Sequence, residues 1–335
     1  AATVFRQYAR SNNLWKAWEE KVSERPPVGK LPGAFVACAG YLRDDGADQT
    51  AAMRYLREYG FERGYLFSPR FFTFDDEHWS RAMGGPVNVL PDSQVEKIQR
   101  LGYICAAFLQ VEEATEAIGA SLFARAQDGS PIVRWRIGEE RYAEISKPRV
   151  VEMLPLLDGR IDPCEGVHHD TVTAMALVED RGCPGYGRQE DAFWRCRILE
   201  HACRRQKVVA SEAMKDWAAG WVDLATSRSY APFAYGGRGR VWTVPLGDLV
   251  YHDCLVRSHW EHLAWNDASH LDGEEFITRY WPHGLILTDY LTASPPVLFP
   301  EGAMYRYRIR TEDAGGIRRL KRDQSTRENY AVRHT

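Results

Sequence analysis

Two acidic residues close apolar runs in this sequence, forty-two positions apart. Asp170 follows the apolar start of "GVHHDTV" (166–172), and Glu212 ends the run "KVVASE" (207–212). Two carboxyl groups that face each other can hydrolyse a glycosidic bond, one as nucleophile or base and the other as proton donor. The pair therefore predicts hydrolysis of a sugar linkage, provided that the fold brings the two side chains together.

Other polar and aromatic residues near the ends of apolar runs fit the same chemistry. Aromatic faces pack on sugar rings, and carboxylate or imidazole groups hydrogen-bond hydroxyls. The predicted substrate-binding residues are His168, His169, Asp216, Trp217, Tyr251, His252, Asp253 and Trp265. Asp253 is also a rival carboxylate for the catalytic pair.

Two other functions remain open at this point. A metal-dependent hydrolase could use His168, His169 and His252, although HExxH is absent and the first apolar run ends "ACAGY" without an HxH pair. A carbohydrate-binding barrel without turnover would show similar residues, but the presence of both acids argues against it. We predict no cofactor and no catalytic metal. A structural calcium ion has no assignable site, because the nearest acidic stretch, "FDDEHW" (74–79), is typical of a helix N-terminus.

The elements that must position these residues alternate along the chain. Strands are predicted at 33–41, 63–69, 103–108, 166–172, 207–212, near 248–254 and at 284–291. Helices are predicted at 48–61, 91–102, 146–159, 188–206 and 274–281. Strands separated by helices pair in parallel through right-handed crossovers, so six or seven such units predict a (β/α)8 TIM barrel. A doubly wound sheet is disfavoured because no GxGxxG or GxxxxGK[ST] turn follows any strand.

In barrels of this kind the active site lies at the C-terminal ends of the strands, so polar residues at those ends are the candidates for function. Asp170 and Glu212 fall there, on the fourth and fifth predicted strands. The 335 residues suit a single catalytic domain over 1–335, with an N-terminal helix and linker over 1–30 before the first strand. The chain starts without Met and stops in mid-pattern at Thr335, so we expect a piece of a longer protein whose barrel is truncated in its last helix.

Composition narrows the classes of partner. The net charge of −3 does not favour nucleic acid, and no apolar segment approaches the roughly 20 residues that span a membrane. We therefore predict a carbohydrate or glycoconjugate partner, with neither nucleic acid nor membrane. The seven cysteines include no CxxC pair, which favours a reducing, cytoplasmic compartment, but because we expect the N-terminus to be truncated, localisation stays open.

Four segments resemble a known group of enzymes. "VFRQYARSNNLWKAWEEKV" with "KLPGAFVACAGY", then "GVHHDTVTAM", "KVVASEAMKDW" and "VPLGDLVYHDCLV" resemble, in order and spacing, segments of the barrel of glycoside hydrolase families 101 and 129. The similarity spans about residues 5–330. It implies a retaining glycosidase for α-linked sugars of the α-N-acetylgalactosaminide type, with Asp170 as nucleophile and Glu212 as acid/base. We expect no room in this chain for the β-sandwich domains that flank the barrel in that group.

Overall fold

The computed structural model describes residues 2–32, 34–38, 49–58, 62–75, 90–137, 139–213, 215–227, 250–251, 253–259 and 286–290. In this part of the chain eight parallel strands pair in chain order, and the last returns to the first, so that the sheet closes into a barrel. The strands are β1 (Phe35–Cys38), β2 (Gly64–Thr73), β3 (Ile104–Gln110), β7 (Gly166–His169), β8 (Val208–Glu212), β9 (Leu224–Ser227), β10 (Val256–His259) and β11 (Ile286–Tyr290). The prediction of parallel strands is confirmed for these residues, and helices stand in the connections from β1 through to β8.

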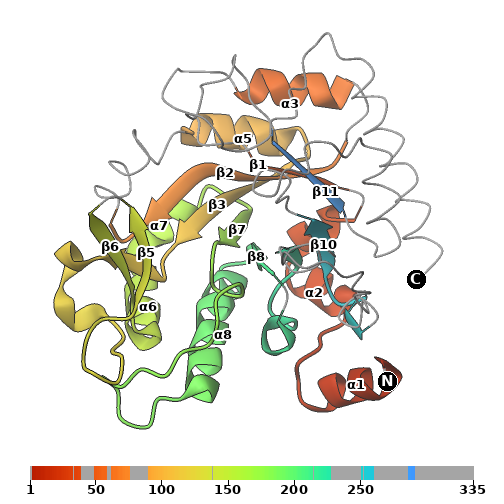
Figure 1. Cartoon of the computed structure of the whole chain (residues 1–335). Helices are drawn as coiled ribbons and strands as arrows, with labels where there is room; N and C mark the ends of the chain where they lie inside the picture. The colour runs from red at the N-terminus through yellow and green to blue at the C-terminus, as the bar shows by residue number, and fades with distance from the viewer. Residues whose placement is uncertain are drawn as a thin grey trace, which may run out of the picture.

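The helices of the described residues cover the outer face of the sheet (Figure 1), except the helix Trp18–Glu24 and the 3-10 turn Pro26–Lys30, which pack against the core inside the barrel. The helices are α1 (Ala2–Ser11), α2 (Trp18–Glu24), α3 (Gln49–Glu58), α5 (Asp92–Arg100), α6 (Lys147–Met153), α7 (Asp158–Ile161) and α8 (Arg188–Arg204), with short 3-10 turns at Pro26–Lys30 and Leu154–Leu157. None of the helices in the described ranges is long and apolar enough to cross a membrane. The helix predicted at 274–281 lies outside the described residues.

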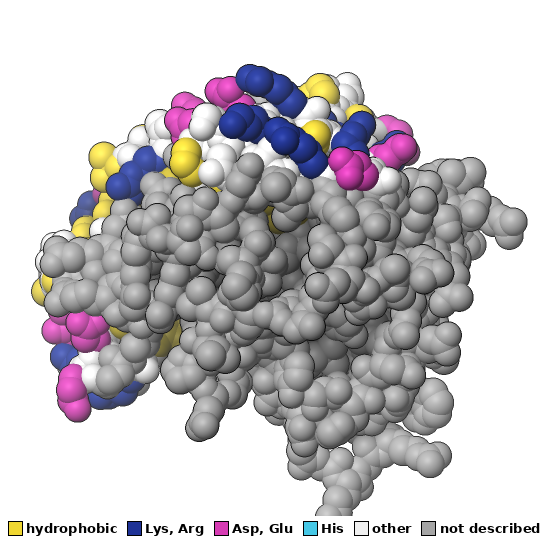
Figure 2. Space-filling view, turned by 90° about the horizontal axis from the view of Figure 1, so that it is seen from above, with side chains coloured by type: hydrophobic (Ala, Val, Ile, Leu, Met, Phe, Trp, Pro, Cys, Tyr) yellow, Lys and Arg dark blue, Asp and Glu magenta, His cyan; other side chains and the backbone are white. Residues whose placement is uncertain are grey.

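Surface charges of both signs are mixed. Figure 2 shows Lys and Arg side chains beside Asp and Glu over the described part of one face. Some of the exposed charges of opposite sign form ion pairs. The Arg100 guanidinium, for example, lies 2.9 Å from the carboxylate of Glu96, which stands one helical turn earlier.

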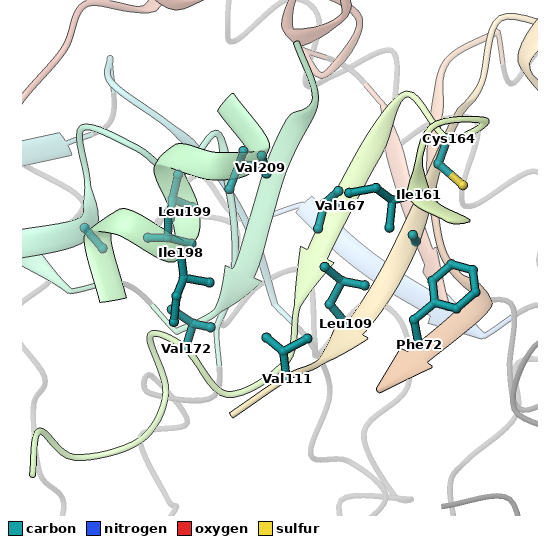
Figure 3. Packing of buried hydrophobic residues seen from close by; sticks show 14 of the residues in the cluster. Phe72, Leu109, Val111, Ile161, Cys164, Val167, Val172, Ile198, Leu199 and Val209 are labelled. Atoms are coloured by element: carbon teal, nitrogen blue, oxygen red, sulfur yellow. The ribbon is translucent and has the colours of Figure 1, made fainter. Parts of the chain in front are cut away.

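Helix α8 packs against the barrel through a stripe of apolar residues at helical spacing. Its buried stripe carries Ile198, Leu199 and Ala202 at helical spacing, and these pack against Val167 of β7 and Val209 of β8 (Figure 3). Acids stand in its first turn and bases in its last, which complements the helix dipole. Among the barrel strands, the helix is thereby fixed mainly against β8, the strand that carries Glu212.

Side chains of the barrel strands alternate between two cores. In β3, Ile104, Ala106 and Phe108 pack into the barrel interior. Cys105 and Leu109 of the same strand pack outward against the helices. Because both faces are buried, every residue of β3 is buried, as is typical of parallel strands between layers. This alternation tells which strand positions face the interior.

The sequence prediction is wrong for the sixth and seventh strands of the barrel, β9 (Leu224–Ser227) and β10 (Val256–His259), whereas the seventh predicted strand, 284–291, matches β11 (Ile286–Tyr290). The strand expected near 248–254 is β10, which begins at Val256, and β9 was not expected at all. The connection from β8 to β9 holds only a 3-10 turn, η5 (Asp216–Ala218), in place of a helix. Helix α2 packs here instead: the buried Lys21 ammonium donates to the carbonyls of Ala219 (3.0 Å) and Val222 (2.6 Å).

A small antiparallel sheet is inserted between β3 and β7, and it was not predicted from the sequence. Its strands are β4 (Glu113–Thr115), β5 (Val133–Ile137) and β6 (Glu140–Glu144), in the order β4-β6-β5. It stands beside α6 and α7 at one side of the barrel (Figure 1). Because β4 begins three residues after β3 ends, the insertion lies at the C-terminal end of the barrel strands.

A buried ion-pair network ties this inserted sheet to α8. The fully buried Arg195 guanidinium lies 2.8 Å from Asp191, 3.0 Å from Glu144 and 3.1 Å from Glu112. Lys147 adds contacts of 2.8 Å to Glu144 and 3.0 Å to Glu112. Each of these buried charges needs its partner of opposite sign, because a buried charge left without one strongly destabilises the folded state.

We expect Arg195→Met to lower the free energy of unfolding by about 3–5 kcal/mol, because it leaves buried carboxylates unpaired. Arg204→Met on the same helix is the matched control. Arg204 pairs with Glu200 on an exposed surface, where an ion pair contributes about 0–1 kcal/mol. Urea denaturation of both variants measures the difference, and a loss below about 1 kcal/mol for Arg195→Met would contradict the role given to the network.

Candidate active site

The two predicted acids lie at the ends of neighbouring parallel strands. Strands β7 and β8 pair up to His169 opposite Ser211, so Asp170 and Glu212 occupy the next level on each strand. The amide of Asp170 donates to the carbonyl of Leu109 at 3.0 Å, which holds this residue against the end of β3. Neighbouring strands run about 4.8 Å apart, so the backbones that carry the acids start within reach of each other.

The alternation of side chains places both acids on the interior side. Ala210 belongs to the core inside the barrel, and Glu212 stands two residues further along the same strand. His168 is stacked on the interior residue Phe67, and Asp170 stands two residues beyond it. Successive strand side chains point to opposite faces, so residues two apart share a face. Glu212 is fully buried and Asp170 is half-buried.

Other polar residues complete this level, and sequence reasoning missed them. Thr73, Gln110 and Thr226 occupy the interior-facing level of β2, β3 and β9 that matches the level of the two acids. All three are buried. Gln110 closes an apolar run, as Asp170 does, and that signal could have identified it. The interior level at this end of the barrel is therefore lined by polar groups.

Thr173 connects the two segments that follow β7 and β8. Its hydroxyl lies 2.9 Å from the Ser211 hydroxyl and 2.8 Å from the Ala213 carbonyl, and it donates to the Glu212 carbonyl. Ala213 itself has a φ of 57°, a left-handed conformation that costs a non-glycine residue roughly 1–2 kcal/mol. Such strain is concentrated at functional sites, and here it directly follows Glu212.

The two adjacent histidines face opposite sides of β7. His168 is stacked between Phe67 (ring centroids 4.3 Å apart) and Phe108 (5.3 Å) inside the barrel. Burial lowers the pKa of His168 to about 3 and that of His169 to about 4, so both are neutral at pH 7. His168 therefore forms part of the barrel floor beneath Asp170, while His169 faces the outer layer.

This arrangement bears on the metal-hydrolase interpretation. The two histidines cannot converge on one ion because they point to opposite faces of a strand. Across the described ranges no group of three or more His, Cys, Asp or Glu side chains is placed to hold a metal ion. The third histidine of that hypothesis, His252, lies outside the described residues, as does Trp265.

Tyr251 and Asp253 are not at the end of a strand, which corrects the sequence prediction. Both precede β10, so they lie at the opposite end of the barrel from Asp170. Asp253 forms an ion pair with Arg6 of α1 and accepts a hydrogen bond of 3.3 Å from Trp15. The strand prediction failed because the apolar run "VYHDCLV" continues into the true strand.

Asp216 and Trp217 also lie apart from the two acids. Both belong to η5, in the connection that returns from β8 to β9. Trp217 packs against the outer core, and its carbonyl accepts a hydrogen bond from the Cys196 thiol of α8 at 3.2 Å. Burial raises the pKa of Asp216, whose carboxyl group lies beside the Tyr251 phenol. The structure does not bring these residues to the level of Asp170 and Glu212.

Comparison with known proteins shows which solved structures have a similar fold. No family model and no curated protein matches the chain. Among solved structures, the α-N-acetylgalactosaminidase NagBb from Bifidobacterium bifidum in its GalNAc complex superposes with a TM-score of 0.70 at 17% sequence identity, over 98% of this chain and 56% of NagBb. The noncanonic maltogenic α-amylase AmyB from Thermotoga neapolitana superposes with a TM-score of 0.53 at 10% identity, over 90% of this chain and 77% of AmyB. This chain thus spans little more than half of NagBb, and it has the barrel fold that these α-glycosidases have.

Proposed function

We propose that this protein is a retaining glycoside hydrolase that cleaves α-linked sugars, with Asp170 as nucleophile and Glu212 as acid/base. The observation that carries the proposal is the placement of the two acids at one level of adjacent parallel strands, on the interior side and at the C-terminal end. The fold shared with two α-glycosidases supports it. The complete architecture that we propose is a single (β/α)8 domain.

The proposed reaction proceeds in two steps. An Asp170 oxygen attacks the anomeric carbon while the bond to the leaving oxygen breaks, and Glu212 gives its proton to that oxygen. Glu212 then removes a proton from water, whose oxygen attacks the same carbon and displaces Asp170. Two inversions restore the original configuration. Carboxyl groups about 5–5.5 Å apart favour this route over inversion, and adjacent strands about 4.8 Å apart are compatible with that separation.

The substrate class is the finer part of the proposal. NagBb is described as an α-N-acetylgalactosaminidase, and it aligns with nearly the whole of this chain. We therefore propose an α-N-acetylgalactosaminide as the first substrate to examine. The mechanism uses carbohydrate as its only partner and needs no cofactor, because two carboxyl groups complete both steps.

A panel of aryl glycosides tests this function. We expect release of the aryl alcohol from p-nitrophenyl α-N-acetylgalactosaminide or another α-glycoside, with the α-anomer formed first in proton NMR spectra. The matching β-glycosides serve as controls. The β-anomer appearing first would contradict retention. Binding of sugar without any product would favour the binding barrel, and activity that chelation removes and only a transition metal restores would favour the metal hydrolase.

A further inference from the structure

Glu113 is a buried carboxyl group next to the proposed nucleophile. It begins β4 and is 1% exposed. The Gln110 amide donates to Glu113 Oε2 at 3.0 Å, and the Thr171 hydroxyl lies 3.3 Å from Oε1. Thr171 follows Asp170 in the chain, and Gln110 shares its level on the adjacent strand. Glu113 is thus joined to the surroundings of Asp170 through two neutral groups.

The cations near Glu113 are already shared by other carboxylates. Lys147 and Arg195 contact Glu112 and Glu144, and Arg195 also contacts Asp191. Arg134 pairs with Glu144. Three cations therefore face three carboxylates before Glu113 is counted. Within the residues that the structure describes, no ion pair joins Glu113 to a cation.

Three carboxylates oppose a negative charge on Glu113, namely Asp170, Glu112 and Glu144. Glu144 is its direct partner across β4 and β6, so the two side chains share a face. Although burial alone raises the pKa of Glu144, Lys147 and Arg195 hold it down to about 2, so Glu144 is ionised. Like charges directly opposite each other in a sheet are destabilising, which favours the neutral form of Glu113.

Asp170 is the carboxylate with the largest effect on Glu113. Burial raises the pKa of Glu113 to about 8, and the charge of Asp170 is the next largest contribution to that rise. Such coupling is mutual, so an ionised Glu113 would oppose the ionisation of Asp170 equally. The groups that act on Glu113 from the surrounding elements are Gln110, Glu112, Glu144, Lys147, Asp170 and Thr171, and of these Lys147 alone lowers its pKa. Arg134 and Arg195 contact the neighbouring carboxylates Glu144 and Glu112.

We propose that Glu113 carries a proton at neutral pH and is a positioning residue that leaves Asp170 as the ionised carboxylate on this side of the site. The inference rests on the proposed role of Asp170. A neutral Glu113 accepts from Gln110 at Oε2 and donates from Oε1 to the Thr171 oxygen, while the Thr171 proton goes to its nearer acceptor, Glu112 Oε2 at 3.1 Å. Glu113 thus fixes both neighbours of Asp170 without adding a charge. The inserted sheet thereby contributes to the site, although it lies outside the barrel sequence pattern.

Infrared spectroscopy tests the proton directly. The difference spectrum between wild type and Glu113→Gln at pH 6 should contain the carbonyl band of one protonated carboxylic acid, which titrates near pH 8. In Asp170→Asn the midpoint should move to lower pH, since the opposing charge is gone. Asp253→Asn, which changes a carboxylate at the other end of the barrel, should leave it in place. No such band, or a midpoint unaffected by Asp170→Asn, would overturn the proposal.

Thermal stability gives a second measurement that needs no activity. The pKa of Glu113 in the folded state lies above its ordinary value of 4.5, so the folded protein keeps a proton that the unfolded chain loses. The stability from this group is fully present below about pH 4.5 and is lost as pH rises through about 8. Glu113→Gln has no proton to lose. Its Tm should therefore rise relative to wild type between pH 5 and pH 8, and a constant difference would overturn the proposal.

The pH dependence of kcat/KM distinguishes a protonated Glu113 that positions its neighbours from an ionised Glu113 that acts on Asp170 through its charge. The acid limb of kcat/KM reports the ionisation of the nucleophile. Glutamine reproduces the protonated acid, so the limb in Glu113→Gln should coincide with that of wild type. If Glu113 were ionised, removing its charge would move the limb to lower pH by about one unit.

The proposed function and this inference fail in different ways. Full activity of Asp170→Asn removes the proposed function, whereas the infrared band concerns Glu113 alone. If Glu113→Gln does not fold, the titration of Glu212→Gln against the double variant Asp170→Asn/Glu212→Gln decides the question, because both lack the other carboxyl group that the proposed mechanism protonates. A band near pH 8 that responds to Asp170 supports the inference, and its absence overturns it.

Discussion

Asp170→Asn is expected to lower kcat/KM for an activated α-glycoside by at least about 10³-fold, because the amide cannot form the covalent glycosyl intermediate. The fold should survive, because asparagine has nearly the shape of aspartate. The backbone N–H of residue 170 still donates to the Leu109 carbonyl in the variant. Circular dichroism and urea denaturation check the fold, and initial rates check the activity.

Asp253→Asn is the matched control for this variant. Asp253 was an alternative catalytic carboxylate by sequence, but it lies before β10 and pairs with Arg6 of the N-terminal helix. Its substitution should leave kcat/KM within about threefold of wild type, as expected for a surface change far from the site. A large loss in Asp253→Asn together with little loss in Asp170→Asn would place the catalytic site at the other end of the barrel.

Glu212→Gln should have an effect that depends on the leaving group. General acid–base catalysis contributes about 10²–10⁴-fold, so kcat/KM for a substrate with a poor leaving group should fall by about that factor. A dinitrophenyl glycoside needs little protonation, so its first step should be much less affected. Azide should then restore turnover, because an anion needs no general base, and the product should be a glycosyl azide with the α-configuration.

Glu165→Gln is the control for Glu212. Glu165 stands just before β7 at the opposite end of the strands and pairs with Lys30 at 2.7 Å, partly exposed. It should keep the activity of wild type on both kinds of substrate. An equal loss for good and poor leaving groups in Glu212→Gln, without azide rescue, would argue that Glu212 is not the acid/base.

The sequence predicted well those elements whose pattern is local. The strand β3 and the helices α5 and α8 were found because an unbroken apolar run or a helical stripe identifies them without their partners. The strand β9 was missed because four residues, "LATS", give too short a pattern and no helix precedes them. β10 was misplaced because two apolar runs are contiguous in the chain.

By itself the sequence determined the strand ends that carry Asp170 and Glu212, since an acid that closes an apolar run marks the point where a strand leaves the core. Only the tertiary structure decided which face each side chain occupies, because the alternation along a strand has no absolute direction until helices cover one side. It also decided the role of Glu113. That role depends on Glu144 opposite, on cations already paired elsewhere, and on Asp170 from another strand, and these residues meet only when the barrel closes.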